Sequence, residues 1–401
     1  MIYYIVLLTH AFTLEVKMSK IQNPTKHTES IKQNKLEQSN LRLRWAVFRQ
    51  NKRAFYSLLI FLVLFVCSMF AEFIANEKPL FIYKDFKIYF PVFVDYPETA
   101  FGGDFQTPCD YLDSYVKDEL LKDAFVLRAI IPYSYDSIIM DLDAQAPTPP
   151  DSKHWLGTDD KARDVASRLI YGYRISIIFA LILSVCSVVV GVVLGALQGY
   201  YGGVLDLVGQ RMIEIFNAVP ILFVIIIISS VFEPSFWWIL CVVGAFSWIL
   251  LVNLVRAEFL KARNLEYVKA AQAMGVSDIK IIFSYILPNA MSATLTFTPF
   301  IMAGSIVTLS SLDFLGFGMP VGSASLGELL SQGKNNLSSP HLGISAFLAL
   351  CVLLSILVFI GEGLRDALDP HIKAHLKTST QESSPDSTDL NLKDSKQGLL
   401  C

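Results

Sequence analysis

Residues 266–289 read EYVKAAQAMGVSDIKIIFSYILPN, and this stretch decides how the chain is interpreted. Around its first half, apolar residues recur at helical spacing on one face: Leu265, Val268, Ala271 and Met274. Gly275 follows, and glycine suits the left-handed conformation that ends a helix. The pattern therefore predicts a helix, a glycine break and a second helix.

The second predicted helix begins where Ser277 or Asp278 can cap it, and Pro288 follows it at the head of an apolar segment. Its apolar positions are Ile279, Ile282, Phe283 and Ile286. An apolar face in a polar loop needs a partner. It either packs on the chain's own helices or docks into a groove on another protein. The residues alone leave both alternatives open.

The composition is that of a membrane protein. Of the 401 residues, 53% are hydrophobic and 17% are charged, and the mean hydropathy is +0.48. A soluble protein carries about 25% charged residues. The net charge of −3 is too small to indicate a nucleic-acid partner.

The sequence contains no recognisable motif for catalysis, metal binding or a cofactor. Its six cysteines form no CxxC pair and its six histidines lack metal-ligand spacing, so we expect no metal site and no disulfide. The nearest approach to a phosphate-binding loop, GELLSQGKN at 327–335, has the wrong spacing and the wrong last residue. We therefore expect no catalytic site here.

Six apolar segments are long enough, or nearly so, to cross a bilayer, which takes about 20 residues. They are Ala54–Phe73, Ile175–Leu197, Ile215–Phe232, Phe236–Val255, Met291–Leu312 and Leu342–Ile360. Ten basic residues from Lys17 to Arg53 precede the first, and five lie between Arg256 and Lys280. By the positive-inside rule, both termini and the loop after the fourth segment should be cytoplasmic.

We therefore predict an all-α polytopic membrane protein of six transmembrane helices, with a periplasmic α+β insert between helices 1 and 2. The predicted parts are a cytoplasmic N-terminal segment (1–53, of which 1–17 is an over-long start), helix 1 (54–73), the insert (74–153), a transmembrane domain (154–371) with a cytoplasmic loop (256–288), and a disordered cytoplasmic tail (372–401). Short β-type runs in the insert predict a hairpin.

The stretch at 266–289 resembles the EAA loop of ABC importer permeases, in which Glu-Ala-Ala is followed by a glycine and then by Ile-x-Leu-Pro. Ala270, Ala271, Gly275, Leu287 and Pro288 match, whereas a lysine and a tyrosine replace the Glu and the Ile. In that family the loop forms a coupling helix that inserts into an ATPase subunit. The resemblance implies these coupling residues: Glu266, Ala270, Ala271, Gly275, Ser277, Asp278, Leu287 and Pro288.

Three further stretches carry the resemblance. Residues 154–176 resemble the segment before the second span of dipeptide, oligopeptide and nickel permeases, with Ala162 where that pattern usually has glycine. Within it, Thr158 or Asp159 can cap a short helix carrying Arg163, Asp164 and Arg168. Residues 362–371 resemble the family's C-terminal ending. Residues 89–105 resemble the enlarged loop of Yej-type permeases, a subgroup associated with peptides and peptide conjugates such as microcin C.

The resemblance implies the permease subunit of an ATP-driven importer of peptides. Its partners would be two ATPase domains or subunits, a second homologous permease, a periplasmic solute-binding protein and the lipid bilayer. An alternative with the same fold is a permease for nickel or another small solute. A secondary transporter would place ionisable residues in mid-span or show inverted repeats, and a sensor would add a signalling domain. The sequence shows neither pattern.

Overall fold

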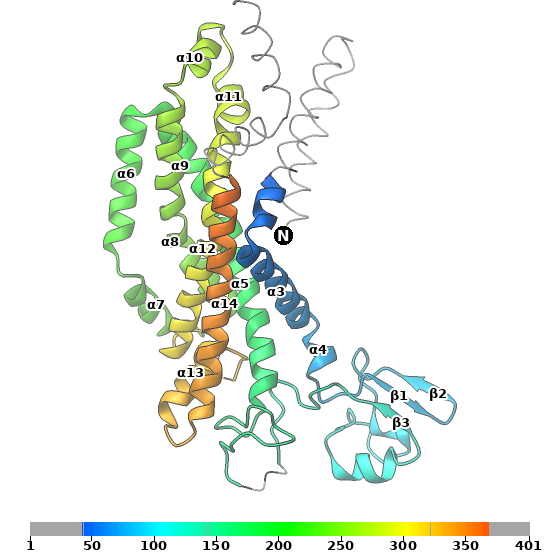
Figure 1. Ribbon diagram of the computed structural model, residues 1–401. Coiled ribbons are helices and arrows are strands. Elements are labelled where there is room, and N and C mark those ends of the chain that lie inside the picture. Colours follow the sequence, from blue (N-terminus) through cyan, green and yellow to red (C-terminus); the bar gives the residue numbers. More distant parts are fainter. Residues whose placement is uncertain (1–41, 43, 141, 143, 321, 369–401) are drawn as a thin grey trace, which may run out of the picture. The chain divides into compact units, whose positions relative to one another are not determined.

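The computed structural model describes residues 42, 44–140, 142, 144–320 and 322–368 (Figure 1). The expected over-long start at 1–17 and the expected disordered tail at 372–401 lie outside these residues. Tyr56–Ile360 forms one compact unit, and the flanking ends of the chain form another. Within the flanking unit, Asn51 Nδ2 donates a hydrogen bond to Asp366 Oδ2 at 3.2 Å. The proposed domain boundaries stay predictions.

Long apolar helices dominate the described chain. By length and composition, five helical stretches can cross a membrane: Lys52–Met69 (α3), Val165–Tyr201 (α5), Phe236–Ala262 (α8, Phe236–Ser247, with α9, Ile249–Ala262), Asp278–Phe314 (α11, Asp278–Ile281, η3, Ile282–Ile286, and α12, Leu287–Phe314) and Pro340–Leu368 (α14). They contain the whole of the second, fourth, fifth and sixth predicted segments. Helix α3 contains most of the first predicted segment, and a separate short helix, Ala71–Ile74 (α4), follows it.

The third predicted segment is not one straight helix. Helix α6 (Gly203–Ala218) and helix α7 (Ile221–Ser229) meet at an angle of 63°. Val219 and Pro220 have extended backbones at the bend. A proline disfavours the helical conformation of the residue before it, which explains why the helix breaks there. The described chain therefore has five candidate spans, or six if the bent pair counts as one.

A ridge of glycines lets α5 lie close to α9. Gly191, Gly195 and Gly199 recur every fourth residue on α5. A Cβ atom on Gly195 would lie 2.8 Å from the Val252 carbonyl oxygen, and one on Gly199 would lie 2.5 Å from Phe259 Cβ. Such small-xxx-small spacing allows close helix packing in lipid, where the hydrophobic effect cannot drive helices together.

The region between α3 and α5 contains the predicted hairpin. Strands β1 (Phe81–Lys84) and β2 (Lys87–Tyr89) pair antiparallel, and β3 (Phe125–Leu127) adds to the other edge of β1. The turn residues Asp85 and Phe86 both have positive φ, which matches the twist of a two-residue hairpin. The sheet packs on a small core of its own that includes η1 (Glu98–Phe101) and η2 (Val116–Leu120).

The end of α4 is attached to the start of α5. Ala71, Ala75, Ile131, Tyr171 and Ala324 form one buried apolar cluster. The Tyr171 hydroxyl donates a hydrogen bond to the Ala75 carbonyl at 3.0 Å. Helix α13 (Leu326–Asn335) lies at this same end of α5, and helix α10 (Glu266–Ala273) lies at the other (Figure 1). The two ends of α5 therefore carry the two sets of residues that the sequence singled out.

Candidate functional site

The loop between α9 and α12 consists of two short helices joined by a glycine turn. Gly275 separates α10 from α11 and has φ +76°, as predicted. Its N–H donates to the Gln272 carbonyl at 2.9 Å, and the Val276 N–H donates to the Ala271 carbonyl at 3.1 Å. This pair of bonds is the Schellman arrangement, which satisfies the last carbonyls of a helix.

One side of the loop packs on the chain's own helices. Val268 and Ala271 of α10 are fully buried, and they join a cluster with Phe259 of α9 and Ala196 and Tyr200 of α5. The second half of the loop contributes Ile281, Ile282 and Ile286 to the same cluster. The loop is therefore fixed to the ends of α5 and α9.

The other side of the loop leaves large apolar side chains uncovered by the described residues. We call this set the docking face; its members and exposed fractions are Leu265 (42%), Tyr267 (41%), Met274 (74%), Ile279 (70%) and Phe283 (50%). The apolar face expected from helical spacing is thus divided, with one part packed on α5 and α9 and the other exposed. Exposed apolar patches of this kind mark interaction sites.

Tyr200 joins the loop to α5 through a polar contact that sequence reasoning missed. Its hydroxyl donates to Asp278 Oδ1 at 2.6 Å, and Gln272 Nε2 donates to the same hydroxyl at 3.5 Å. Ser277 occupies the N-cap position of α11, but its side chain makes no capping bond. The expected cap of Ser277 or Asp278 is therefore corrected, because Asp278 is engaged by Tyr200 instead.

The structure brings all eight predicted coupling residues into this loop. Of them, Ala271 is buried and Leu287 is partly buried, while six are exposed: Glu266, Ala270, Gly275, Ser277, Asp278 and Pro288. Pro288 is the second residue of α12 and directly follows the π-helical turn Ile282–Ile286, a type of irregularity that accommodates a proline within a longer helix. The second half of the loop is continuous with α12, since helical structure runs from Asp278 to Phe314.

The other end of α5 is held by a buried cluster of ion pairs. Asp159 is completely buried, and its Oδ2 atom lies 2.7 Å from Arg163 Nη2 and 2.8 Å from Arg168 Nη1. Arg168, also completely buried, places Nη2 3.0 Å from Glu328 Oε2 of α13. Burial raises the pKa of Glu328, and Arg163 and Lys161 oppose that shift. The cluster joins α13 to the start of α5.

The short helix expected over Arg163, Asp164 and Arg168 is wrong. Arg163 and Asp164 precede α5, and Asp164 is its N-cap, accepting a hydrogen bond from the Ser167 N–H at 2.8 Å. Asp159 is not a helix cap, because no helix begins there; its Oδ1 atom accepts hydrogen bonds from the Lys161 and Arg163 N–H groups, and its Oδ2 atom pairs with both arginines. Ala162 has φ +59°, which explains why the resembling pattern usually has glycine at this position.

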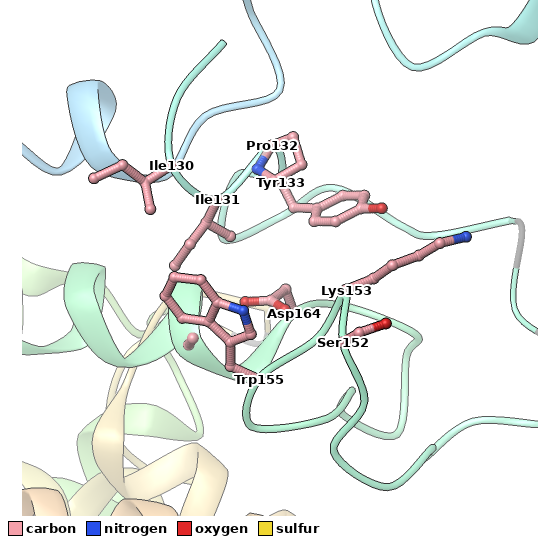
Figure 2. A pocket seen from close by; sticks show the side chains of 9 residues that line it. Ile130, Ile131, Pro132, Tyr133, Ser152, Lys153, Trp155 and Asp164 are labelled. Atoms are coloured by element: carbon pink, nitrogen blue, oxygen red, sulfur yellow. The ribbon is translucent and has the colours of Figure 1, made fainter.

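A cavity of about 370 Å³ lies beside this cluster, between residues 130–133 and the start of α5. Figure 2 shows the Trp155 indole near Ile131 and Asp164, with Tyr133 and Lys153 on the other side. Asp164 is already bonded to Ser167 and lies 3.1 Å from His154 Nδ1. Among the described residues, no group of three or more His, Cys, Asp or Glu side chains is placed to hold a metal ion.

Two protein-family models match parts of this chain. Residues 191–374 match the family model of the binding-protein-dependent transport system inner membrane component. Residues 39–91 match the N-terminal TM domain of oligopeptide transport permease C. The first match contains the whole loop, and the second contains α3 and the hairpin.

Related proteins match over most of their own length. The inner membrane ABC transporter permease protein YejE of Escherichia coli (strain K12) is 55% identical, over 82% of this chain and 96% of that protein. The peptidoglycan transport system permease protein YejE of Agrobacterium fabrum is 48% identical, over 82% and 92%. The oligopeptide transport system permease protein OppC of Haemophilus influenzae is 35% identical, over 60% and 77%.

Proposed function

The chain belongs to the inner membrane permeases of binding-protein-dependent ABC transporters, and on this premise we propose that it imports peptides through a loop-coupled pathway. In this proposal, the loop at 256–288 docks on cytoplasmic ATPase subunits that hydrolyse ATP. The chain itself contributes spans and the coupling loop rather than a catalytic group. The observation that carries the proposal is the docking face.

The docking face has the chemistry of a surface that enters a groove. Met274 and Ile279, each at least 70% exposed, lie on either side of the Gly275 turn. Their neighbours Val268 and Ile281 are fully buried against the spans, so the backbone beneath the docking face is held in place. A helix that presents apolar side chains from a fixed backbone suits helix-in-groove recognition.

The loop is also connected to two spans, so a displacement of the loop would move them. Ile279 lies in the same continuous helical stretch as α12, and Tyr200 ties Asp278 to α5. An ATPase that moves the docking face would therefore move the ends of two spans together. Coupling of this kind requires contacts that differ between two states of the transporter.

The remaining parts of the proposal concern partners and orientation. A second homologous permease would complete the pathway, and a periplasmic solute-binding protein would deliver the peptide to the end of α5 that carries the ion cluster. Both termini would lie in the cytoplasm and residues 74–153 in the periplasm. The names of two relatives refer to oligopeptide and peptidoglycan transport, and peptide bonds are the chemistry that those cargoes share.

Co-purification in mild detergent tests the docking role. We expect an ATPase to co-purify with the wild-type chain but not with the Ile279→Asp variant. The ATPase would bury Ile279 at the interface, and replacing such an apolar anchor by a charge weakens an interface by about 2 kcal/mol or more. Leu337→Asp is the matched control, since Leu337 is 83% exposed and follows α13 at the other end of α5. ATPase retained by Ile279→Asp and by Met274→Asp alike would contradict the docking face.

Gly275→Pro tests the turn independently. Proline fixes φ near −65° and has no N–H, whereas Gly275 has φ +76° and donates to Gln272. We expect this variant to lose the ATPase while its spans remain inserted.

Uptake of a labelled peptide by cells, compared with uptake of nickel, separates the peptide cargo from the small-solute alternative. Nickel uptake without peptide uptake would overturn the cargo assignment.

A further inference from the structure

The small sheet after α4 has apolar side chains on both faces, whereas an ordinary surface sheet is polar on its outer face. Its inner face packs Ile82, Tyr89 and Val126 on the core of the insert. Lys84 lies on this inner face as well, and its Nζ donates to the Phe101 carbonyl at 2.5 Å and the Leu120 carbonyl at 2.7 Å. The Lys84 ammonium group therefore satisfies backbone carbonyls of the insert instead of pointing into solvent.

The outer face of the same sheet is entirely apolar or aromatic. We call it the outer sheet face; it consists of Phe81, Tyr83, Ile88, Phe125 and Leu127, which the pairing register places on one side. Four of them are strongly exposed: Tyr83 (41%), Ile88 (57%), Phe125 (64%) and Leu127 (50%). An antiparallel sheet with one face on its core normally directs polar residues outward. An apolar outer face indicates that something apolar covers it.

Aromatic ring contacts and one backbone turn connect the outer sheet face with α4, which follows the first candidate span. Phe73 of α4 contacts Phe93, with ring centroids 5.8 Å apart. Phe81 of the sheet contacts both Phe90, at 5.7 Å, and Phe125, at 6.4 Å. Phe93 and Phe90 also belong to one turn, because the Phe93 N–H donates to the Phe90 carbonyl. Phe73 also contacts Phe70, which directly follows α3, so the aromatic surface extends from the sheet to the end of the first candidate span.

We propose that the outer sheet face rests on the lipid bilayer, at the level where α3 and α4 leave the membrane. The continuity with Phe70 and Phe73 favours lipid over a protein partner, because these residues directly follow a helix long and apolar enough to cross the membrane. Aromatic side chains are enriched at this depth, where apolar rings meet headgroups. Phe86, at the hairpin tip, adds a further aromatic side chain that is 96% exposed. The sheet thereby anchors the insert beside the span.

Spin-label accessibility in native membrane vesicles tests the proposal on the assembled transporter. Single cysteines replace Phe125 or Ile88 in a chain whose own cysteines are substituted, and a nitroxide is attached. Val63→Cys on α3 gives the lipid reference, since Val63 is 54% exposed within the span. Asp118→Cys gives the water reference, from an exposed site elsewhere in the insert. Each label is scored by its accessibility to oxygen and to a water-soluble nickel complex.

We expect the labels at Phe125 and Ile88 to favour oxygen over nickel several-fold more than the label at Asp118, close to the ratio at Val63. A low accessibility to both reagents would show that protein covers the face, which would overturn the proposal in favour of a binding protein or second permease. A high accessibility to nickel would show a face in water and would also overturn it. Because both sites are exposed, labelling is compatible with folding, and co-purification of each variant with its partners verifies assembly.

Discussion

The two ends of α5 are held by opposite kinds of chemistry. At its start, Arg168 is completely buried and bonded to Asp159 and Glu328. At its end, Gly199 packs directly on Phe259, and Tyr200 adds a partly buried hydrogen bond to Asp278. One end is joined to α13 by charges, and the other is joined to α9 and the loop by close apolar packing.

The difference bears on how each end can move. A buried ion pair that loses one partner leaves an uncompensated charge, so the start of α5 strongly resists partial opening. The loop end relies on apolar contact and on partly buried hydrogen bonds of Tyr200, each of which changes gradually with displacement. We infer that the charged end is a fixed point and that the loop end is the movable one. Stability measurements on matched variants test this contrast.

Arg168→Met should have the largest effect. It removes the hydrogen bonds that Arg168 donates to Asp159, Glu328 and the Ser323 carbonyl, and it leaves the buried Asp159 carboxylate paired with Arg163 as its remaining cation. Breaking a buried pair by removing one partner costs about 3–5 kcal/mol. We expect a markedly lower thermal midpoint of the purified chain in detergent.

The control for Arg168→Met is Lys78→Met. Lys78 pairs with Asp95, but the two side chains are 36% and 58% exposed. Exposed pairs contribute about 0–1 kcal/mol. Equal midpoints for the two variants would mean that the cluster at the start of α5 does not fix that end.

Gly199→Val should have the second largest effect. A Cβ at this position would lie 2.5 Å from Phe259 Cβ and 2.7 Å from the Arg256 carbonyl oxygen. Overpacking of this kind costs about 1–3 kcal/mol. Gly304→Val on α12 is the control, because no atom lies within 4 Å of its added Cβ. A drop in thermal midpoint confined to Gly199→Val would confirm that close packing holds the loop end.

Local patterns in the sequence predicted much of the fold. The left-handed turn at Gly275 and the presence of a hairpin between the first two predicted spans are confirmed. Local signals of this type depend only on neighbouring residues. The third segment was predicted less well, because hydropathy does not register the bend that Pro220 imposes on an otherwise apolar run.

Contacts between distant residues could not be predicted in the same way. Tyr200 and Asp278 are 78 positions apart, and Arg168 and Glu328 are 160 apart. No periodic pattern encodes which turn of one span meets which turn of another. One clue was present, since Ala162 stands where the resembling pattern has glycine, and it is here that the backbone has positive φ.

Tyr200→Phe should weaken the loop end by about 1 kcal/mol, the typical contribution of one hydrogen bond. It removes the donor to Asp278 and the acceptor from Gln272 while the ring stays in its apolar cluster. Hydrogen exchange measured by mass spectrometry should show faster exchange in α10 and α11, with α13 unchanged. Faster exchange in α13 as well would mean that the two ends are coupled.

The smallest effects should come from a pair of reciprocal substitutions at the two left-handed positions. Ala162, with φ +59°, precedes α5, and Gly275, with φ +76°, ends α10. A side chain in this conformation costs about 1–2 kcal/mol, and glycine's greater freedom in the unfolded chain offsets about half of that. Ala162→Gly should therefore raise the thermal midpoint and Gly275→Ala should lower it, by similar small amounts. No atom lies within 4 Å of a Cβ added to Gly275, so backbone conformation alone determines the sign there. An unchanged thermal midpoint with slower transport for Gly275→Ala would mean that the turn matters for motion of the loop and not for its stability. That distinction separates the movable end of α5 from the fixed one.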